Sequence, residues 1–240
     1  MNNPADRVDF YHIRRFQDGI ALCFVHIPAF AASHIPDLDL ASFRRVRAMI
    51  LDETGPLSRY FTADDFQRIN HFKVMKKQVE WMAGKAAVKI LACERGLAPE
   101  ADIRIAAEDN GAPFLMDSPD IPISISHSGD YAVCAMGEHG GIVAADIEQI
   151  EPGRMQTFVG VAFSDQEIQL LQGRSDQDHY LAWTMKEAFL KYIKKGFAEG
   201  LKKVEIMDGQ IIHHGQPVLG IEIHSELFER DYALTLIWRK

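Results

Sequence analysis

The sequence contains little cysteine, no long apolar run and no cysteine–histidine motif. Only Cys23, Cys93 and Cys134 occur among its 240 residues, without the CxxC or cysteine–histidine spacing typical of zinc sites, so we expect buried free thiols in a reducing compartment. His213 and His214 have no third ligand at a useful spacing, and we expect both on the surface. The apolar core of a signal peptide and any stretch of bilayer length are also absent, which predicts a cytoplasmic protein without a membrane partner.

The chain is also short of positive charge. With 26 basic and 34 acidic residues, its net charge is −8, which argues against nucleic acid as a partner because nucleic-acid binders need a basic surface. A polyanionic ligand would therefore require a local concentration of lysine or arginine. Hydrophobic residues make up 47% of the chain and charged residues 25%, the balance of a globular protein with a sizeable core.

Helical and alternating patterns follow one another along the chain. Helical spacing predicts helices over residues 38–51, 62–72, 76–94, a short segment from Ser164, and a segment capped by Asp176 that ends at Lys194. Alternation predicts strands over residues 20–27, 103–107, 121–126, 131–137, 142–148, 204–207, 210–213, 218–224 and 232–238, with a polar turn over 127–130.

The order of strand, helices and several strands occurs twice. This repetition predicts an α+β fold made of a pseudo-twofold pair of similar subdomains, each a mostly antiparallel sheet packed on a long helix, with a cleft between them. We expect the boundary at Gly140-Gly141, so that residues 1–140 form one subdomain and residues 141–240 the other.

Two short stretches carry most of the chemistry. Asp146 and Glu148 end the strand over 142–148, and side chains two apart on a strand share a face. Glu187 and Lys191 stand four apart on a helix and are therefore neighbours. Crowded carboxylates repel one another unless a cation neutralises them, and oxygen ligands suit Mg²⁺, which predicts one Mg²⁺ between the three acids. The alternative is a solvated strand end and a surface ion pair, which either motif alone would favour.

Two further groups of polar residues suit an anion. Ser126, His127 and Ser128 lead into a turn at Gly129, and this arrangement is a better anion site than a lone surface histidine. A cluster of lysines surrounds the helix over 76–94: Lys73, Lys76, Lys77, Lys85 and Lys89. These lysines form either a phosphate-binding wall or an ordinary solubilising surface, and charge alone does not decide between the two.

Four blocks of the sequence together resemble the 4′-phosphopantetheinyl transferases of the surfactin-synthetase-activating (Sfp) type. They occur in the family's order: EWMAGK at 80–85, ISHS at 125–128, DIE at 146–148 and WTMKEAFLK at 183–191. The last block is the most specific, because it joins an aromatic residue, a small polar residue, a KE pair and a lysine four positions after the glutamate. The resemblance covers about residues 59–196.

The resemblance implies a two-halved α+β fold with its active site at the interface. It implies transfer of 4′-phosphopantetheine from coenzyme A to a serine of an apo acyl or peptidyl carrier protein, with release of 3′,5′-ADP. Asp146, Glu148 and Glu187 match the family's Mg²⁺ ligands, and Glu187 also matches the residue that deprotonates the serine directly or through water. A glutamate beside a lysine and a metal ion should have a low pKa, which favours its metal role over its role as a base.

Further residues are expected to serve the same reaction as a holo-acyl-carrier-protein synthase. We expect a monomer in which the catalytic residues are Asp146, Glu187 and Lys191. The residues expected to contact coenzyme A are Lys77, Lys85, Ser126, His127, Ser128 and Lys191, with His127 at the 3′-phosphate. The carrier protein, which would serve fatty-acid, polyketide or peptide synthesis, has the face over residues 44–47 and the region 158–163 as candidate docking surfaces.

The chain departs from the family pattern at three positions. Ala112 replaces a basic residue in the Gly-x-Pro turn, Ala144 replaces the glycine two residues before Asp146, and Lys85 replaces an arginine. These departures keep two alternatives open: a non-catalytic relative that binds carrier proteins, and an unrelated Mg²⁺-dependent phosphohydrolase. Three retained carboxylates and Lys191 argue against mere docking.

Overall fold

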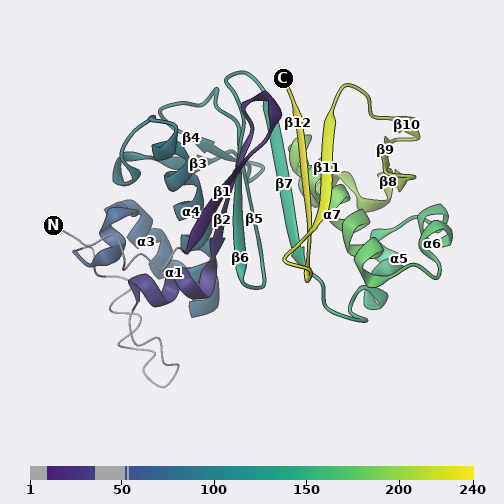
Figure 1. The fold of residues 1–240 in the computed structure, drawn as a ribbon, viewed down its shortest axis with the longest axis horizontal. Coiled ribbons are helices and arrows are strands. Elements are labelled where there is room, and N and C mark those ends of the chain that lie inside the picture. Colours follow the sequence, from purple (N-terminus) through teal and green to yellow (C-terminus); the bar gives the residue numbers. More distant parts are fainter. Residues whose placement is uncertain (1–9, 36–51, 53) are drawn as a thin grey trace.

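Two antiparallel sheets form the middle of the protein, and helices cover the outer face of each (Figure 1). The computed structural model describes residues 10–35, 52 and 54–240, so the helix predicted over 38–51, with the candidate docking face over 44–47, lies outside the described residues. The first sheet has the order β1 (Tyr11–Arg15), β2 (Ala21–His26), β6 (Tyr131–Met136) and β5 (Ile123–Ser128). The second has the order β11 (Glu222–Phe228), β12 (Tyr232–Arg239) and β7 (Ile142–Gln149).

Three helices begin at capping boxes in the sequence. The hydroxyls of Thr62, Ser164 and Ser175 each accept a bond from the backbone N–H three residues later, whose acidic side chain bonds back. Asp176 was the predicted cap of α7 but is instead its first residue, because Ser175 forms a complete capping box with Asp178. The helices are α1 (Ile27–His34), α3 (Ala63–His71), α4 (Met75–Glu94), α5 (Val159–Ala162), α6 (Asp165–Leu171) and α7 (Asp176–Tyr192).

Smaller elements connect these layers. Hairpin strands are β3 (Ile105–Ala107), β4 (Pro113–Leu115), β8 (Val204–Met207), β9 (Gln210–His213) and β10 (Gln216–Pro217). The 3-10 helices are η2 (Gln17–Gly19), η4 (Pro56–Arg59), η5 (Glu100–Asp102), η6 (Met155–Thr157), η7 (Gly196–Glu199) and η8 (Leu201–Lys203).

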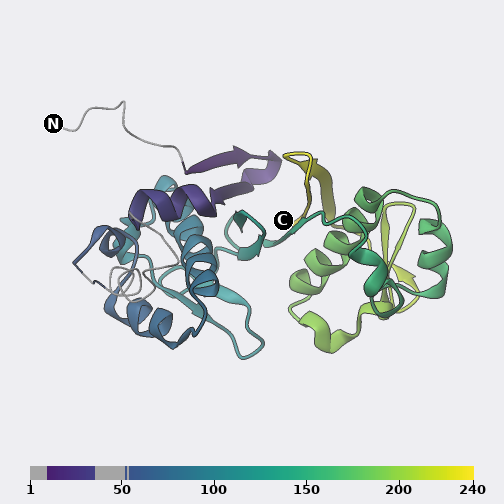
Figure 2. The same ribbon diagram turned by 90° about the horizontal axis from the view of Figure 1, so that it is seen from below.

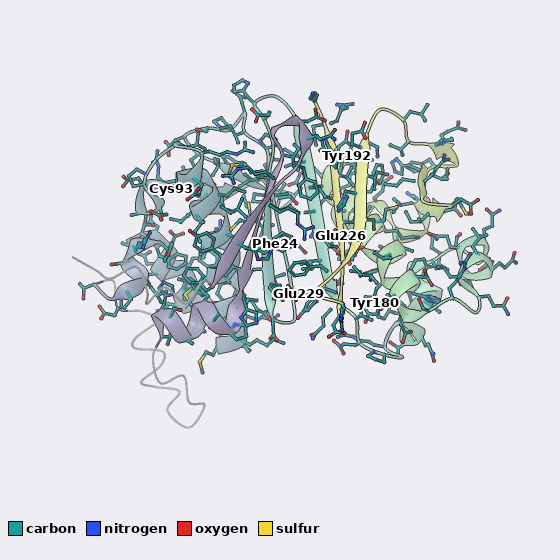
Figure 3. The ribbon with its side chains drawn as sticks, in the orientation of Figure 1. Phe24, Cys93, Tyr180, Tyr192, Glu226 and Glu229 are labelled. Carbon is teal, nitrogen blue, oxygen red and sulfur yellow. The ribbon has the colours of Figure 1, made fainter. Side chains whose placement is uncertain are left out.

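The two sheets pack face to face through an apolar layer. Leu22 and Phe24 of β2 point into this layer, while the alternate positions of β2 point to α4. Phe24 stacks on Phe228 of β11 with ring centroids 4.6 Å apart. Arg14 of β1 forms an ion pair with Glu226 of β11, so these two strands meet here. Phe24 and Glu226 lie centrally in Figure 3, and Figure 2 shows the purple and yellow strands between the two groups of helices.

The predicted fold class, an α+β fold with antiparallel sheets packed on long helices, is confirmed. The two sheets share one connection pattern, because the last strand of each half lies between that half's penultimate strand and an earlier one: β2-β6-β5 and β7-β12-β11. A pseudo-twofold relation and the boundary at Gly140-Gly141 stay predictions.

Several boundaries and environments differ from the sequence-based predictions. The predicted turn over 127–130 is wrong at His127 and Ser128, which continue β5 because they pair with β6. The strand predicted over 218–224 begins only at Glu222. β1 and α1 were not predicted, since β1 mixes basic and aromatic residues without a clear alternation.

The expected surface position of His213 and His214 is also wrong in part. Both imidazoles contact the buried carboxylate of Glu199, which is a possible third ligand that sequence spacing did not reveal. Cys23 and Cys134 are buried as expected, whereas Cys93 is only half-buried. Among the described residues, no helix combines the length and apolar character needed to cross a membrane.

Candidate active site

Asp146 lies at the centre of a polar cluster on the edge of β7 that faces β5. Its side chain is buried, and its Oδ1 accepts hydrogen bonds from Ser126 Oγ and Lys191 Nζ, each at 2.7 Å. Its Oδ2 is buried and has no hydrogen-bond partner among the described residues. A buried carboxylate oxygen without a donor is costly, so Oδ2 is well suited to bind a cation.

Glu148 and Glu187 bring two more carboxylates to Asp146. Glu148 lies two residues further along β7 on the same face, and Glu187 approaches from α7. The three side chains offer oxygen atoms that lie within 4.8 Å of one another. An oxygen-only set of this size fits Mg²⁺, which keeps its remaining coordination positions for phosphate oxygens and water.

The cluster carries more negative than positive charge. Burial, and next the charge of Asp146, raises the pKa of Glu148 to about 7 and the pKa of Glu187 to about 8. Lys191 lowers both pKa values only in part. The low pKa expected for Glu187 beside a lysine and a metal ion stays a prediction, and among the protein groups alone burial and two carboxylates outweigh one ammonium.

Three serines at alternate positions of β5 hold β7 in register. The Oγ atoms of Ser124, Ser126 and Ser128 accept bonds from the backbone N–H groups of residues 145, 147 and 149 at 3.1, 3.4 and 3.0 Å. Ser126 donates to Asp146, and Ser128 donates to Glu148 at 2.7 Å. The two sheets are thus joined at this edge by side chains that also orient two of the three carboxylates.

From the sequence, we expect Ser126 and Ser128 to contact coenzyme A. In the structure their hydroxyls are engaged with the carboxylates and the backbone of β7. Side chains alternate along a strand, so His127 points to the opposite side of β5, where it is exposed. Contact of these residues with coenzyme A stays a prediction.

The two predicted lysine contacts on α4 differ in environment. Lys77 is exposed. Lys85 is buried, and its Nζ lies 3.4 Å from the carbonyl oxygen of Ile105 and 5.4 Å from the ring centre of Trp81. Burial lowers the pKa of Lys85 to about 8. A phosphate-binding role stays a prediction for both lysines.

A cavity of about 580 Å³ adjoins the cluster and is lined by residues of both halves of the chain. Its walls are the loop over 108–114, the starts of β5 and β7, and the end of α7. Of the predicted site residues, Lys191 lines this cavity, and Lys194 adds a second ammonium nearby. A volume of this size suits a small-molecule ligand. The Lys191 ammonium also donates to Asp146, so it connects the cavity to the carboxylates.

Lys186 belongs to the same sequence block as Glu187 but has a different role that the sequence analysis missed. Its side chain is fully buried and donates to Glu167 at 2.6 Å and to the carbonyl groups of Ala162 and Leu201 at 2.9 and 3.2 Å. The pair fastens α7 to α6 and η8. A lysine between apolar helix positions was the available signal, since a buried ammonium needs a partner.

Comparison with known proteins adds a second line of support. Residues 142–237 match the family model described as the 4′-phosphopantetheinyl transferase superfamily. This span contains the three clustered carboxylates and Lys191. The resemblance to this superfamily that the four sequence blocks predicted is therefore confirmed for the part of the chain that carries the site.

Individual relatives point to the same family. The chain is 27% identical to the 4′-phosphopantetheinyl transferase ffp of Bacillus subtilis over 175 residues, which are 69% of this chain and 75% of the relative. It is 24% identical over 172 residues to the 4′-phosphopantetheinyl transferase Sfp of Bacillus subtilis (strain 168), with the same coverage of 69% and 75%. It is 30% identical over 163 residues to the L-aminoadipate-semialdehyde dehydrogenase-phosphopantetheinyl transferase of Pongo abelii, covering 61% of this chain and 52% of that protein.

Proposed function

We propose that this chain is a member of the 4′-phosphopantetheinyl transferase superfamily and transfers 4′-phosphopantetheine from coenzyme A to a serine of an apo acyl or peptidyl carrier protein. The product released with the modified carrier would be 3′,5′-ADP. The observation that carries this proposal is the convergence of Asp146, Glu148 and Glu187 from two distant elements, with oxygen atoms within 4.8 Å of one another. All the groups come from one chain, so a monomer would suffice.

Asp146, Glu148 and Glu187 would hold one Mg²⁺. The unpartnered Oδ2 of Asp146 and the excess of buried negative charge support this assignment. When bound, Mg²⁺ would neutralise the diphosphate of coenzyme A and stabilise the leaving group. Ser126 and Ser128 would keep Asp146 and Glu148 turned toward the ion, as hydrogen-bond partners of metal ligands generally do.

Lys191 and the adjoining cavity would position coenzyme A. The ammonium of Lys191 lies between the carboxylates and the cavity, where it can offset the charge that develops on the departing phosphate. Ala112, which replaces the family's basic residue, lines the same cavity as Lys191 and Lys194. We infer that Lys194, which pairs with Glu108 at 2.5 Å, supplies part of the missing positive charge.

Among the three carboxylates, Glu187 would be the one that accepts the proton of the carrier serine. Burial and the neighbouring carboxylates raise the pKa of Glu187 to about 8, so its carboxyl group is strongly basic but mostly protonated near neutral pH until a cation neutralises the cluster. Oxygen coordination to a cation would lower that basicity, and a bound water would then relay the proton of the carrier serine. The serine oxygen would attack the phosphorus of the phosphopantetheine phosphate, and the bond to the 3′,5′-ADP oxygen would break.

The division of labour between the halves follows from these positions. Residues 1–140 would contribute most of the coenzyme A contacts, including Lys77, Lys85 and His127, and residues 141–240 would contribute the metal ligands. The carrier protein would approach the open side of the cluster, with the region 158–163 as a candidate contact.

The test is to incubate the protein with coenzyme A, Mg²⁺ and each of several apo carrier proteins, and to weigh the carriers by mass spectrometry. We expect a mass increase of one phosphopantetheine on the carrier serine, absent with EDTA and with Glu187→Ala. Coenzyme A binding without any mass increase would favour the non-catalytic relative, and phosphate release from simple esters would favour the phosphohydrolase. Either result would contradict the proposed transfer.

A further inference from the structure

A second group of metal-binding side chains lies beyond the end of the α7 helix. The carboxylate of Glu199, at the end of η7, is 7% exposed. Its Oε1 lies 2.9 Å from Nε2 of His213 and 2.6 Å from Nε2 of His214. Its Oε2 lies 2.9 Å from Nζ of Lys195. Two imidazoles therefore share one carboxylate oxygen, while the second oxygen is held by a lysine.

The backbone adopts an uncommon conformation to bring both imidazoles to the same side. Consecutive side chains on an extended strand point to opposite faces. His214 and Gly215 form the two-residue turn between β9 and β10, with φ of +50° and +75°. Such turns favour asparagine, aspartate or glycine at both positions, and a histidine with positive φ is uncommon. The positive φ at His214 turns its ring toward Glu199, beside the ring of His213 with centroids 4.3 Å apart.

We propose that Glu199, His213 and His214 bind one Zn²⁺ ion. Two imidazole nitrogens and one carboxylate oxygen form a donor set that Zn²⁺ favours, and the ligand atoms lie within 4.8 Å of one another. Lys195 occupies the other oxygen of Glu199 and so leaves Oε1 for the ion. The side chain of His214 is 53% exposed, which leaves a fourth position open to water.

The alternative is that Glu199, His213, His214 and Lys195 form a cluster of ion pairs without a metal ion. In that arrangement both imidazoles and the Lys195 ammonium share one carboxylate, and the imidazole rings lie tilted at 50° to each other. One divalent ion would instead take both Nε2 atoms and Oε1 of Glu199 as ligands, since these three atoms already converge. Because metal ligands must be deprotonated, binding would release protons and weaken in acid.

The ion would connect the end of α7 to the β9–β10 hairpin. Glu199 follows the last turn of α7 by a short segment, and the ring of His213 packs on Phe189 of α7 with centroids 5.3 Å apart. Phe189 lies between Glu187 and Lys191 in the sequence but faces the opposite, apolar side. This zinc site would therefore stabilise α7 on the face opposite Glu187 and Lys191, and it is independent of the proposed transfer reaction.

The experiment titrates the untagged, full-length protein with Co²⁺ in the presence of excess Mg²⁺ and follows the visible absorption of protein-bound Co²⁺. Zn²⁺ is then added to displace it, and the thermal unfolding temperature is recorded with and without Zn²⁺. We expect one equivalent of Co²⁺, displacement by one equivalent of Zn²⁺, and a higher unfolding temperature with Zn²⁺.

The decisive variant is His214→Asn, because asparagine suits the turn while removing the ligand. His214→Asn and His213→Ala should both lose the absorption band and the Zn²⁺-dependent rise in unfolding temperature. His139→Ala, at an exposed histidine paired with Asp120, and Asp146→Asn should retain both. Absence of saturable binding in the parent, or undiminished binding in His214→Asn, would overturn the zinc site whatever the transfer assay gives.

Discussion

Two lysine–carboxylate pairs stand on the same helix and have nearly the same length, yet their surroundings differ. Lys186 contacts Glu167 at 2.6 Å, and Lys191 contacts Asp146 at 2.7 Å. In the first pair one acid meets one ammonium, and backbone groups complete the hydrogen bonds of both. In the second, three acids share one ammonium, and Oδ2 of Asp146 has no hydrogen-bond partner in the described part of the chain.

The comparison shows how a buried ion pair that supports the fold differs from one that belongs to a site. In the pair of Lys186 and Glu167, the charges neutralise each other and the hydrogen bonds are complete. Such a pair holds helices together but offers no free charge or free hydrogen-bonding atom to a ligand. Excess charge of one sign at the junction of two sheets is costly for the fold and is relieved by a cation. The first pair should therefore govern stability, and the second should govern activity.

The largest expected effect is on catalysis at the second pair. Asp146→Asn removes one negative charge but keeps an oxygen for Ser126 and Lys191. We expect kcat/KM for carrier modification to fall by at least about 10²- to 10³-fold, because the ligand that places the charge-stabilising ion is lost. Unfolding in urea should show a free energy close to that of the parent. If the Asp146→Asn variant kept the activity of the parent, the claim that the pair of Lys191 and Asp146 governs activity would be wrong.

The opposite outcome is expected at the first pair. Lys186→Met leaves the carboxylate of Glu167 buried without its cation, and the free energy of unfolding should fall by about 3–5 kcal/mol. The double variant Lys186→Met with Glu167→Gln should recover part of that loss. Lys76→Met, in an exposed pair with Glu80, serves as the control and should change stability by less than about 1 kcal/mol. Equal urea midpoints for all these variants would contradict the structural role of Lys186.

A smaller effect separates two neighbouring serines of β5. Ser126→Ala and Ser124→Ala each remove a hydroxyl that accepts from the backbone of β7, so each should lower stability by about 1–2 kcal/mol. Ser126 also donates to Asp146, so its loss should weaken Mg²⁺ binding by about 10- to 100-fold. Ser124→Ala should leave Mg²⁺ affinity unchanged, as measured by calorimetry. Equal affinities in both variants would show that the hydroxyl of Ser126 does not orient Asp146.

The smallest effect concerns the pH dependence at Lys85. Burial lowers its pKa in the folded protein to about 8, with Asp65 opposing this shift and Arg68 and Lys89 adding to it. The unfolded chain therefore binds more protons between pH 8 and the ordinary lysine pKa of about 10.4, and stability should rise with pH across this window. The slope for the parent should exceed that for Lys85→Met by up to about 1.4 kcal/mol per pH unit. Parallel slopes in urea unfolding would contradict this account.

The sequence predicted those parts of the fold that local patterns encode. Strand alternation located β2, β6, β7 and β12 closely, acidic residues after Thr62 located the start of α3, and a capping box at Ser164 located the start of α6. β1 escaped prediction because its stability comes from pairing with β2 rather than from its own pattern. The same holds for the end of β5, where pairing with β6 overrides the turn-like composition.

The candidate site was predictable where spacing within one element decides which face a side chain takes. Asp146 with Glu148 and Glu187 with Lys191 are such pairs, and the resemblance to a known family joined them. The contacts of Ser126 with Asp146, of Lys186 with Glu167 and of His214 with Glu199 depend on tertiary approach or on a turn conformation. Spacing rules relate residues within one helix or strand, so they do not predict contacts between residues far apart in the sequence. The structure was therefore needed to find these three contacts.

The most direct test of the central claim counts divalent ions bound by the three carboxylates. Mn²⁺, as a paramagnetic substitute for Mg²⁺, is titrated into the His214→Asn protein and the free ion is measured by electron paramagnetic resonance. We expect one saturable site per chain that Mg²⁺ displaces, and no such site when Asp146→Asn is added. The same Mn²⁺ binding with and without Asp146→Asn would contradict a shared cation at Asp146, Glu148 and Glu187.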